Sequence, residues 1–246
     1  MLEVQSIADS APSKRVAILQ SNYIPWKGYF DLIAMVDEFI TYDDMQYTRR
    51  DWRNRNKIKT PQGSQWLSIP IKTKGHYFQS IKETEIDGEG WAKQHWRALE
   101  LNYKRAPYFQ WLADELAPYY LSRTWTHLSE LNIALIRLIC NLLTIKTPLR
   151  LSGEFLLDGE KTARLVSICR QTGATHYLSG PSALNYIQPH LFEAHNIVLE
   201  WFDYSGYPEY PQLWGPFDHH LSILDLLFNC GPEASRYIQK GITAHA

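Results

Sequence analysis

The sequence has little net charge and no long hydrophobic run, and each absence excludes a class of partner. Its 246 residues carry 25 Lys and Arg against 26 Asp and Glu, a formal net charge of -1. A chain so balanced has no overall field that would draw it to nucleic acid or to an anionic membrane. No apolar stretch approaches the roughly 20 residues that span a bilayer. We therefore expect no membrane span and no nucleic-acid partner.

Cysteine is scarce, and the spacings typical of metal sites are missing. Cys140, Cys169 and Cys230 form no CxxC pair and lie among apolar neighbours, which is typical of buried thiols in a reducing compartment. The nine histidines show neither HxxxH nor HExxH spacing, so no metal site is predicted. Residues 1–13 lack the basic start and apolar run of a secretory signal and are expected to be disordered. These features predict a cytoplasmic protein.

What the sequence does contain is an alternation of short apolar strands with helices, in two separate parts of the chain. Residues 15–20 have the pattern of a strand buried on both faces. A helix follows from about Gly28, and a second strand covers residues 38–42. The alternation returns after Pro148, which favours a parallel sheet. Further strands are expected at 149–151, 175–179 and 197–202, with helices at 162–171, from 181 and at 222–229.

These elements predict an α/β fold with a parallel, Rossmann-like (nucleotidyltransferase-like) sheet and an inserted lobe. The sheet domain is expected from residues 14–45 and 148–231. Residues 46–147 form the lobe, which should be partly strand and mostly helix, and residues 232–246 form a C-terminal tail. Within the lobe we expect strands at 66–71 and 80–85 and a long amphipathic helix at 128–143.

The loop after the first strand is the first candidate site, because it would lie at the carboxyl edge of the sheet, where such folds bind ligands. Gly28 lets a ligand or another backbone approach closely, and free N–H groups at a helix start attract phosphate. The loop has neither a Walker motif nor GxGxxG, and an ordinary connection packed with aromatics is the alternative. Its hydrogen-bonding side chains are Gln20, Asn22, Tyr23, Trp26, Lys27 and Tyr29.

A basic segment at residues 52–57 is the second candidate. In an extended chain Arg53, Arg55 and Lys57 share one face, which could clamp phosphate groups through the fork of each guanidinium. Asn54 lies on the opposite face and could hydrogen-bond a sugar or a base. The alternative is a solvated edge strand whose charges discourage aggregation.

Two acidic residues and two histidines are candidate proton acceptors. Asp43 and Asp44 end the second strand at the carboxyl edge, where a carboxylate could act as a base or bind ribose. His219 and His220 precede the last helix and titrate near neutral pH. The alternatives are a turn or helix cap for the aspartates and a structural or exposed position for the histidines.

A fourth candidate is the segment where a later strand runs into a helix start. Ser179, Gly180 and Ser182 bring hydroxyl and amide groups to a place where a phosphate or a carbonyl oxygen could bind. A plain capping role for Ser182 is the alternative. Together with the first strand, this segment would place polar groups on two sides of one crevice at the sheet edge.

Four segments together resemble the WbqC-like protein family: residues 20–31, 52–56, 177–180 and 221–231. The resemblance covers nearly the whole chain. This family is met in bacterial gene clusters for O-antigen (lipopolysaccharide) and other surface polysaccharides. The resemblance implies modification of an activated amino sugar, with amide formation from an acyl or aminoacyl group. It supplies no catalytic residues, so the roles given above depend on the residues alone.

A more distant resemblance is to nucleotidyltransferases that carry an HxGH signature after the first strand. Residues 25–29 occupy that place here, but Trp26 or Lys27 and Tyr29 replace the two histidines. In those enzymes the histidines stabilise the pentavalent phosphorus, so their loss argues against nucleotidyl transfer. Nucleotide binding does not depend on them.

Three functions are consistent with these residues. The first is a transferase that moves an acyl or aminoacyl group from a thioester donor onto a nucleotide-linked amino sugar. The basic segment would bind the diphosphate of that ligand, or of another small anionic ligand. The second is a nucleotidyltransferase that uses ATP or another nucleotide with magnesium. The third is a non-catalytic adaptor that binds an acyl-carrier-type protein through its aromatic surface.

Overall fold

The computed structural model describes residues 13–238 and confirms the α/β fold with a Rossmann-like parallel sheet. The segment predicted to be disordered, residues 1–13, lies outside the described residues except for Ser13. The sheet has five strands in the order β5-β2-β1-β6-β7, and every neighbouring pair is parallel. The strands are β1 (Arg15–Leu19), β2 (Glu38–Thr41), β5 (Leu149–Leu151), β6 (His176–Ser179) and β7 (Val198–Trp201).

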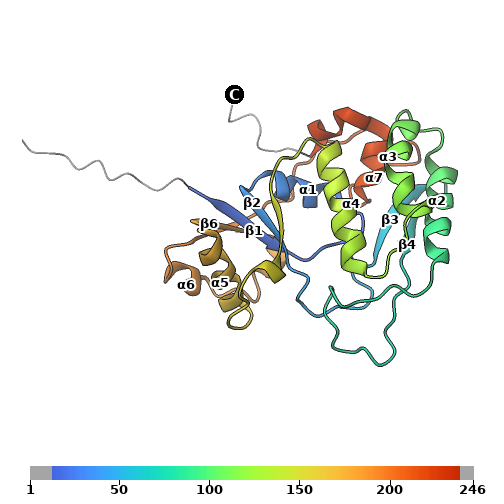
Figure 1. Cartoon of the computed structure of the whole chain (residues 1–246). Helices are drawn as coiled ribbons and strands as arrows, with labels where there is room; N and C mark the ends of the chain where they lie inside the picture. The colour runs from blue at the N-terminus through green and yellow to red at the C-terminus, as the bar shows by residue number, and fades with distance from the viewer. Residues whose placement is uncertain (1–12, 239–246) are drawn as a thin grey trace, which may run out of the picture.

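Strands β1 and β2 are buried because helices cover both faces of the sheet (Figure 1). On one face, Val16 and Ile40 pack with residues of α5 and α6. On the other face, Ala17 and Phe39 join the larger core that includes α1, α4 and α7. Strands covered on both faces need apolar side chains in both directions, which explains the continuous apolar runs. The helices are α1 (Lys27–Ala34), α2 (Gly90–Tyr103), α3 (Phe109–Leu121), α4 (Leu128–Leu142), α5 (Thr162–Thr172), α6 (Pro189–Glu193) and α7 (Ile223–Cys230).

Between the two parts of the sheet the chain forms a hairpin and three helices. The hairpin joins β3 (Arg55–Thr60) to β4 (Gly63–Ser68) in antiparallel register. The expected strand at 66–71 therefore starts earlier and ends at Ser68. The division of the chain into a sheet domain and an inserted lobe stays a prediction.

The expected strand at residues 80–85 is wrong, since the structure has only isolated bridges at its two ends. Glu83 accepts hydrogen bonds from the N–H and the hydroxyl of Ser80, at 2.9 and 2.7 Å. The Thr84 N–H donates to the carbonyl of Ile81 at 3.2 Å. These local bonds compete with a strand ladder and close a turn instead.

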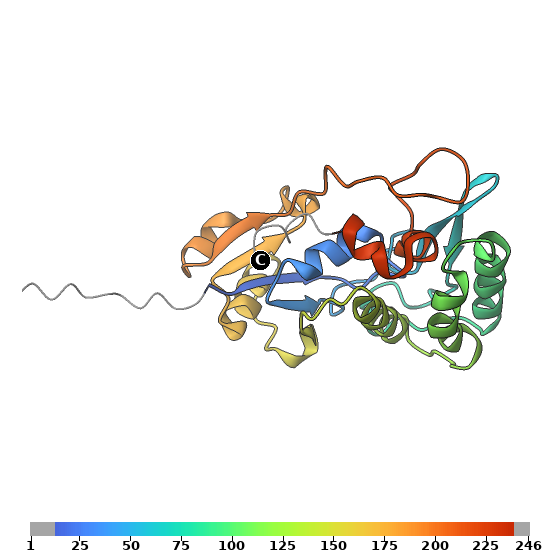
Figure 2. The ribbon, with the colours of Figure 1, turned by 90° about the horizontal axis from the view of Figure 1, so that it is seen from above.

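The segment from 202 to 222 links β7 to α7 and passes the tip of the β3–β4 hairpin (Figure 2). It ends where the Ser222 N–H donates to the Lys57 carbonyl at 2.8 Å. After α7, a 3-10 helix, η3 (Gly231–Tyr237), follows directly, where the sequence predicts only a tail. Within residues 13–238, no helix is both long enough and apolar enough to cross a bilayer.

Candidate functional site

The loop between β1 and α1 is held in an unusual backbone conformation. Ile24 has a φ of 38°, in a region that β-branched residues rarely adopt, and its side chain is fully buried. The side-chain amide of Asn56 donates to the carbonyls of Tyr23 and Ile24, at 3.1 and 2.8 Å. The Tyr23 N–H donates to the Trp52 carbonyl at 3.0 Å. The segment around β3 therefore fixes the shape of this loop.

Gly28 is required here because an indole ring lies against its backbone. A Cβ atom at Gly28 would lie 2.4 Å from the ring of Trp26. That ring packs between other rings, with centroids 5.3 Å from Tyr204, 5.7 Å from Tyr207 and 6.3 Å from His220. The close approach that the sequence predicts at Gly28 is therefore made by the neighbouring tryptophan of the same loop.

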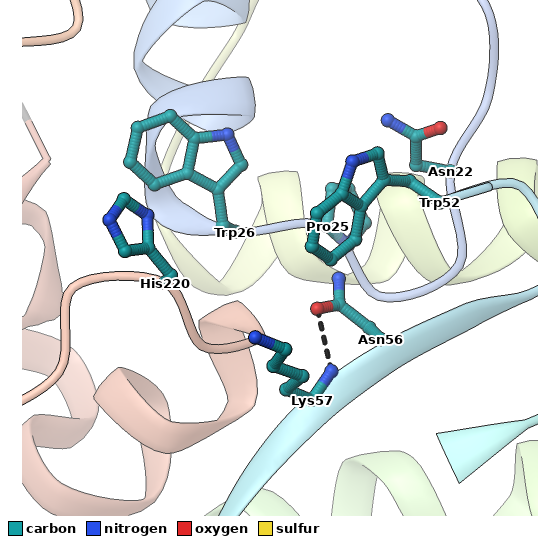
Figure 3. Close-up of a pocket in the computed structure, with 7 residues that line it drawn as sticks. All are labelled: Asn22, Pro25, Trp26, Trp52, Asn56, Lys57 and His220. Carbon is teal, nitrogen blue, oxygen red and sulfur yellow. Dashed lines mark hydrogen bonds between the residues drawn. The ribbon is translucent and has the colours of Figure 1, made fainter. Parts of the chain in front are cut away.

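Two adjoining cavities open around this loop. The smaller, of about 310 Å³, we call the aromatic slot. The larger, of about 780 Å³, lies at the carboxyl edge of β1 and β6, and we call it the sheet-edge cavity. Asn22 and Trp52 line both of them. The slot is lined by Asn22, Pro25, Trp26, Trp52, Asn56, Lys57 and His220 (Figure 3).

The sheet-edge cavity brings together three segments that are far apart in the sequence. They follow β1, precede β3 and follow β6. This is the point where the strand order reverses, with β2 on one side of β1 and β6 on the other, and open α/β sheets bind ligands at such a point. Of the predicted site residues, it is lined by Gln20, Asn22, Arg53, Ser179, Gly180 and Ser182.

The charged side chains in the described lining of the sheet-edge cavity are both cations. Its described lining includes the cations Arg53 and Lys161 and no carboxylate. The Arg53 guanidinium donates to the side-chain oxygen of Gln20 at 3.1 Å and to that of Asn22, and it lies 3.6 Å from the carboxylate of Asp51. Arg53 is therefore held in place in the wall of the sheet-edge cavity, bonded to Asn22, which lines both cavities.

Lys27 and the two tyrosine rings that its ammonium contacts are absent from the lining of both cavities. Its ammonium donates to the carbonyl of Pro208 at 3.1 Å and lies 5.1 Å from the ring centroids of both Tyr207 and Tyr210. Burial lowers the pKa of Lys27 to about 8. Aromatic faces attract a cation, so Lys27 fastens the segment after β7 to the start of α1.

Tyr23 and Tyr29 are buried and hydrogen-bonded within the core. The Tyr23 hydroxyl lies 2.9 Å from Nδ1 of His95 and 2.6 Å from the hydroxyl of Tyr120. The Tyr29 hydroxyl donates to the backbone carbonyl of Gln20 at 3.0 Å. Both tyrosines therefore point into the protein core, where their hydrogen bonds stabilise the loop.

Asn54 and Arg55 also lie away from the cavity walls. The Asn54 side-chain amide donates to the carbonyl of Ile69 at 2.8 Å, which ties β3 to the chain after β4. The Arg55 guanidinium lies 4.2 Å from the ring centroid of Trp66 and donates to the carbonyl of Arg50. In this basic segment, Arg53 and Lys57 are the cations that face the cavities.

The two aspartates are engaged in other contacts. Asp43 is buried and accepts hydrogen bonds from the N–H and hydroxyl of Ser21, at 2.8 and 2.6 Å, and from the hydroxyl of Ser129. Asp44 pairs with Lys82. Neither lines the aromatic slot or the sheet-edge cavity. The role of proton acceptor stays a prediction for both.

The two histidines differ in their access to the site. His219 packs edge-on against Phe217, with ring centroids 4.5 Å apart, and its buried Nδ1 has no hydrogen-bond partner among the described residues. Burial, together with the positive charge of Lys27, lowers the pKa of His219. His220 lines the aromatic slot beside Trp26. Of the predicted proton acceptors, His220 is the one that lines either of the two cavities.

Several residues that line the sheet-edge cavity were not predicted. Each lies in the connection that follows a strand of the sheet: Lys161 after β5, Tyr186 and Gln188 after β6, and Tyr204 after β7. The rule that ligands bind beyond the carboxyl ends of parallel strands would have identified these connections. Which side chains within them face the cavity depends on the fold.

The chain resembles known proteins along nearly its whole length. The sequence profile of the WbqC-like protein family matches residues 20–237, a range that contains every lining residue of both cavities except Ile18 and Leu19. The uncharacterized protein Rv1507c of Mycobacterium tuberculosis (strain H37Rv) is 57% identical over 226 residues, which cover 92% of this chain and 98% of the relative. No solved structure matches the chain significantly.

Proposed function

We propose that this chain, which belongs to the WbqC-like protein family, is a transferase that acts on a nucleotide-linked amino sugar in surface-polysaccharide biosynthesis. It would bind this sugar at the carboxyl edge of its sheet and join an acyl or aminoacyl group to the sugar amine. The activated amino sugar is the substrate class that the family resemblance implies. A thioester is the donor class that fits amide formation without a further activating step.

The observation that carries the proposal is the charge and position of the sheet-edge cavity. About 780 Å³ at the strand-order reversal is within the range of small-ligand sites. The described lining presents the cations Arg53 and Lys161 and no carboxylate, and the Asp51 carboxylate that pairs with Arg53 lies outside that lining. Arginine binds phosphate oxygens through two parallel N–H groups, so a diphosphate fits the environment of Arg53.

The chemical step needs a proton acceptor, and His220 supplies one in the proposed mechanism. The sugar amine attacks the thioester carbonyl carbon, a C–N bond forms and the C–S bond breaks. The proton leaves the amine for the imidazole and then passes to the departing thiolate, so that the products are an amide and a thiol. The ammonium of Lys57, which lines the same slot, would stabilise the negative charge that develops on the carbonyl oxygen.

Two alternative functions are nucleotidyl transfer and binding of a carrier protein without catalysis. Nucleotidyl transfer with magnesium is disfavoured because magnesium sites in proteins use carboxylates, and the described lining of the sheet-edge cavity has none. A carrier-protein adaptor is favoured by one observation: the side chains of Tyr77 and Phe78 are 67% and 87% exposed. Such rings are common at protein interfaces.

A thermal-shift screen with nucleotide sugars, coenzyme A thioesters and ATP tests the proposal. A ligand at 100 times its Kd stabilises the native state by about 2.7 kcal/mol, or roughly 5–10 °C for a chain of this size. Nucleotide sugars should give this shift, and Arg53→Ala should abolish it. Arg55→Ala removes a neighbouring arginine outside the cavity walls and serves as the matched control.

The alternatives predict other patterns in the same screen. A shift with ATP alone would favour nucleotidyl transfer. The absence of any shift would contradict the proposal and favour the adaptor. If Arg53→Ala and Arg55→Ala reduce the thermal shift with nucleotide sugars equally, Arg53 has no specific role in binding them.

A further inference from the structure

The two cavities differ in the chemistry of their walls, and each suits a different part of an extended ligand. The aromatic slot has two indole rings, a proline and the imidazole of His220 (Figure 3). The sheet-edge cavity has hydroxyl and amide groups together with Arg53 and Lys161. The cavities share Asn22 and Trp52, so they adjoin at these two side chains, and one extended ligand would pass them to occupy both.

We infer that the aromatic slot binds the amino-sugar ring, that Arg53 binds the diphosphate at the junction, and that the nucleoside occupies the sheet-edge cavity. This assignment depends on the proposed function and adds the orientation of the ligand to it. It also makes Lys57 a residue of the sugar subsite and Lys161 a residue of the nucleoside diphosphate subsite.

Three observations support this orientation over the reverse one. The reacting amine must lie within reach of a proton acceptor, and His220 lines the slot and not the larger cavity. The polarised C–H groups of a sugar ring pack favourably on the electron-rich faces of Trp26 and Trp52. The larger cavity lies at the strand-order reversal, where open α/β sheets bind nucleotides.

The slot is also shaped to hold a ring in one place. Trp26 is fixed by its packing on Tyr204 and Tyr207. Trp52 lies 5.4 Å from Trp66, measured between ring centroids, and the ammonium of Lys57 lies 5.1 Å from the Trp66 ring. The Lys57 side chain extends toward His220 in Figure 3, so a ring in the slot would meet an ammonium and an imidazole.

A matched pair of lysine variants tests the orientation. The ligands are UDP, GDP, CDP and dTDP, each alone and as its conjugate with a 2-amino sugar, and the affinity is measured by titration calorimetry. We expect the conjugate to bind the unaltered protein more tightly than the bare diphosphate. Lys57→Ala should weaken the affinity for the conjugate about tenfold, because the variant loses a hydrogen bond from the Lys57 ammonium to the sugar. The affinity for the bare diphosphate should not change, since that ligand has no sugar to accept this bond.

Lys161→Ala should weaken the conjugate and the bare diphosphate by the same factor. The orientation is overturned if Lys57→Ala weakens the bare diphosphate, if Lys161→Ala does not, or if the conjugate has no advantage in affinity. Circular dichroism and thermal melting confirm that both variants are folded. If no member of the panel binds the unaltered protein, the proposed function itself fails, which separates the two results.

Discussion

At the scale of single residues, Asn56 determines the shape of the loop between β1 and α1. Its side chain is buried and donates to two carbonyls of the loop after β1, one of them in the residue with positive φ. A buried carbonyl that loses its donor keeps its full desolvation cost. A strained backbone persists only where its surroundings hold it, and Asn56 is the part of those surroundings that comes from β3.

We therefore predict that Asn56→Ala lowers the free energy of unfolding by about 2–4 kcal/mol, because two buried carbonyls lose a hydrogen bond and a small cavity forms. The same variant should lose nucleotide-sugar binding, since the loop lines both cavities. Urea unfolding and the thermal-shift screen measure the two effects. Asn141→Ala, at an exposed position of α4, is the control and should change neither. Full ligand binding in Asn56→Ala would show that the loop keeps its shape without this residue.

Individual residues of the site were predicted unevenly. Arg53 was expected to bind phosphate because of its chemistry, and the fold places it in the lining of a cavity, while its binding of a ligand stays a prediction. Lys27 shows the opposite case: a lysine in a polar loop suggests a ligand contact, yet the fold buries it against aromatic rings. Local sequence gives the type of side chain and its approximate place in an element. The direction in which it points depends on residues more than a hundred positions away.

At the scale of elements, the start of α7 links the two segments that form the slot. The Ser222 N–H donates to the Lys57 carbonyl of β3 at 2.8 Å, and the Ile223 N–H donates to the carbonyl of Pro25 at 2.9 Å. The Ser222 hydroxyl also caps the helix by accepting from the Leu224 N–H at 3.2 Å. The first turn of α7 therefore orders the loop and the hairpin together.

Ser222→Ala should lower the free energy of unfolding by about 1 kcal/mol, the usual loss when a helix cap is removed. Chemical denaturation gives this value directly. Ser64→Ala at an exposed position of β4 removes the same hydroxyl without a cap, and we expect no measurable change. A stability of Ser222→Ala equal to that of Ser64→Ala would show that the cap contributes nothing.

Elements with a clear apolar pattern were predicted to within one or two residues. The strands β1, β2 and β7 and the helix α4 are examples, because burial in this fold demands the very periodicity that the sequence shows. The extent of β3 was not recognised, because Ile58 is the single apolar residue of Arg55–Thr60. This segment forms a strand because its backbone pairs with β4. The expected strand at 80–85 failed for the converse reason, because the carboxylate of Glu83 closes a turn.

At the scale of the whole molecule, one buried histidine makes stability depend on pH. His95 lies in the large core, with Nε2 3.2 Å from the Ser68 carbonyl and Nδ1 2.9 Å from the Tyr23 hydroxyl. Nε2–H therefore donates to the carbonyl and Nδ1 accepts from the tyrosine. Burial lowers the pKa of His95 to about 4, so it is neutral in the folded protein near neutral pH.

The unfolded chain binds a proton at an ordinary histidine pKa of about 6.5, so the unfolded state is favoured as the pH falls from 6.5 toward 4. Between pH 7 and pH 4.5 this single group should reduce the free energy of unfolding by about 2.5 kcal/mol. His95→Gln should lose that part of the pH dependence, as measured by urea unfolding at both pH values. His190→Gln, at an exposed position, is the control for replacing a histidine. The prediction is contradicted if the free energy of unfolding of His95→Gln changes with pH as much as that of the unaltered protein.

The overall α/β class was predictable from the alternation of elements, whereas the order of the strands and the cavities between their ends were not. Strand order decides which loops become neighbours, and periodicity contains no information about it. Placing β6 beside β1 brings Ser179 to the loop after β1. The hairpin brings Arg53 there from another direction. This convergence depends on tertiary packing and was a hypothesis until the fold was known.

The shared wall formed by Asn22 and Trp52 has a thermodynamic consequence. Two separate molecules, one in each cavity, would both contact the same two side chains, so that occupancy of either cavity alters the affinity of the other. Linkage requires this influence to be equal in both directions. A fragment in the slot would change the Kd of a nucleoside diphosphate by the same factor by which the nucleoside diphosphate changes the Kd of the fragment.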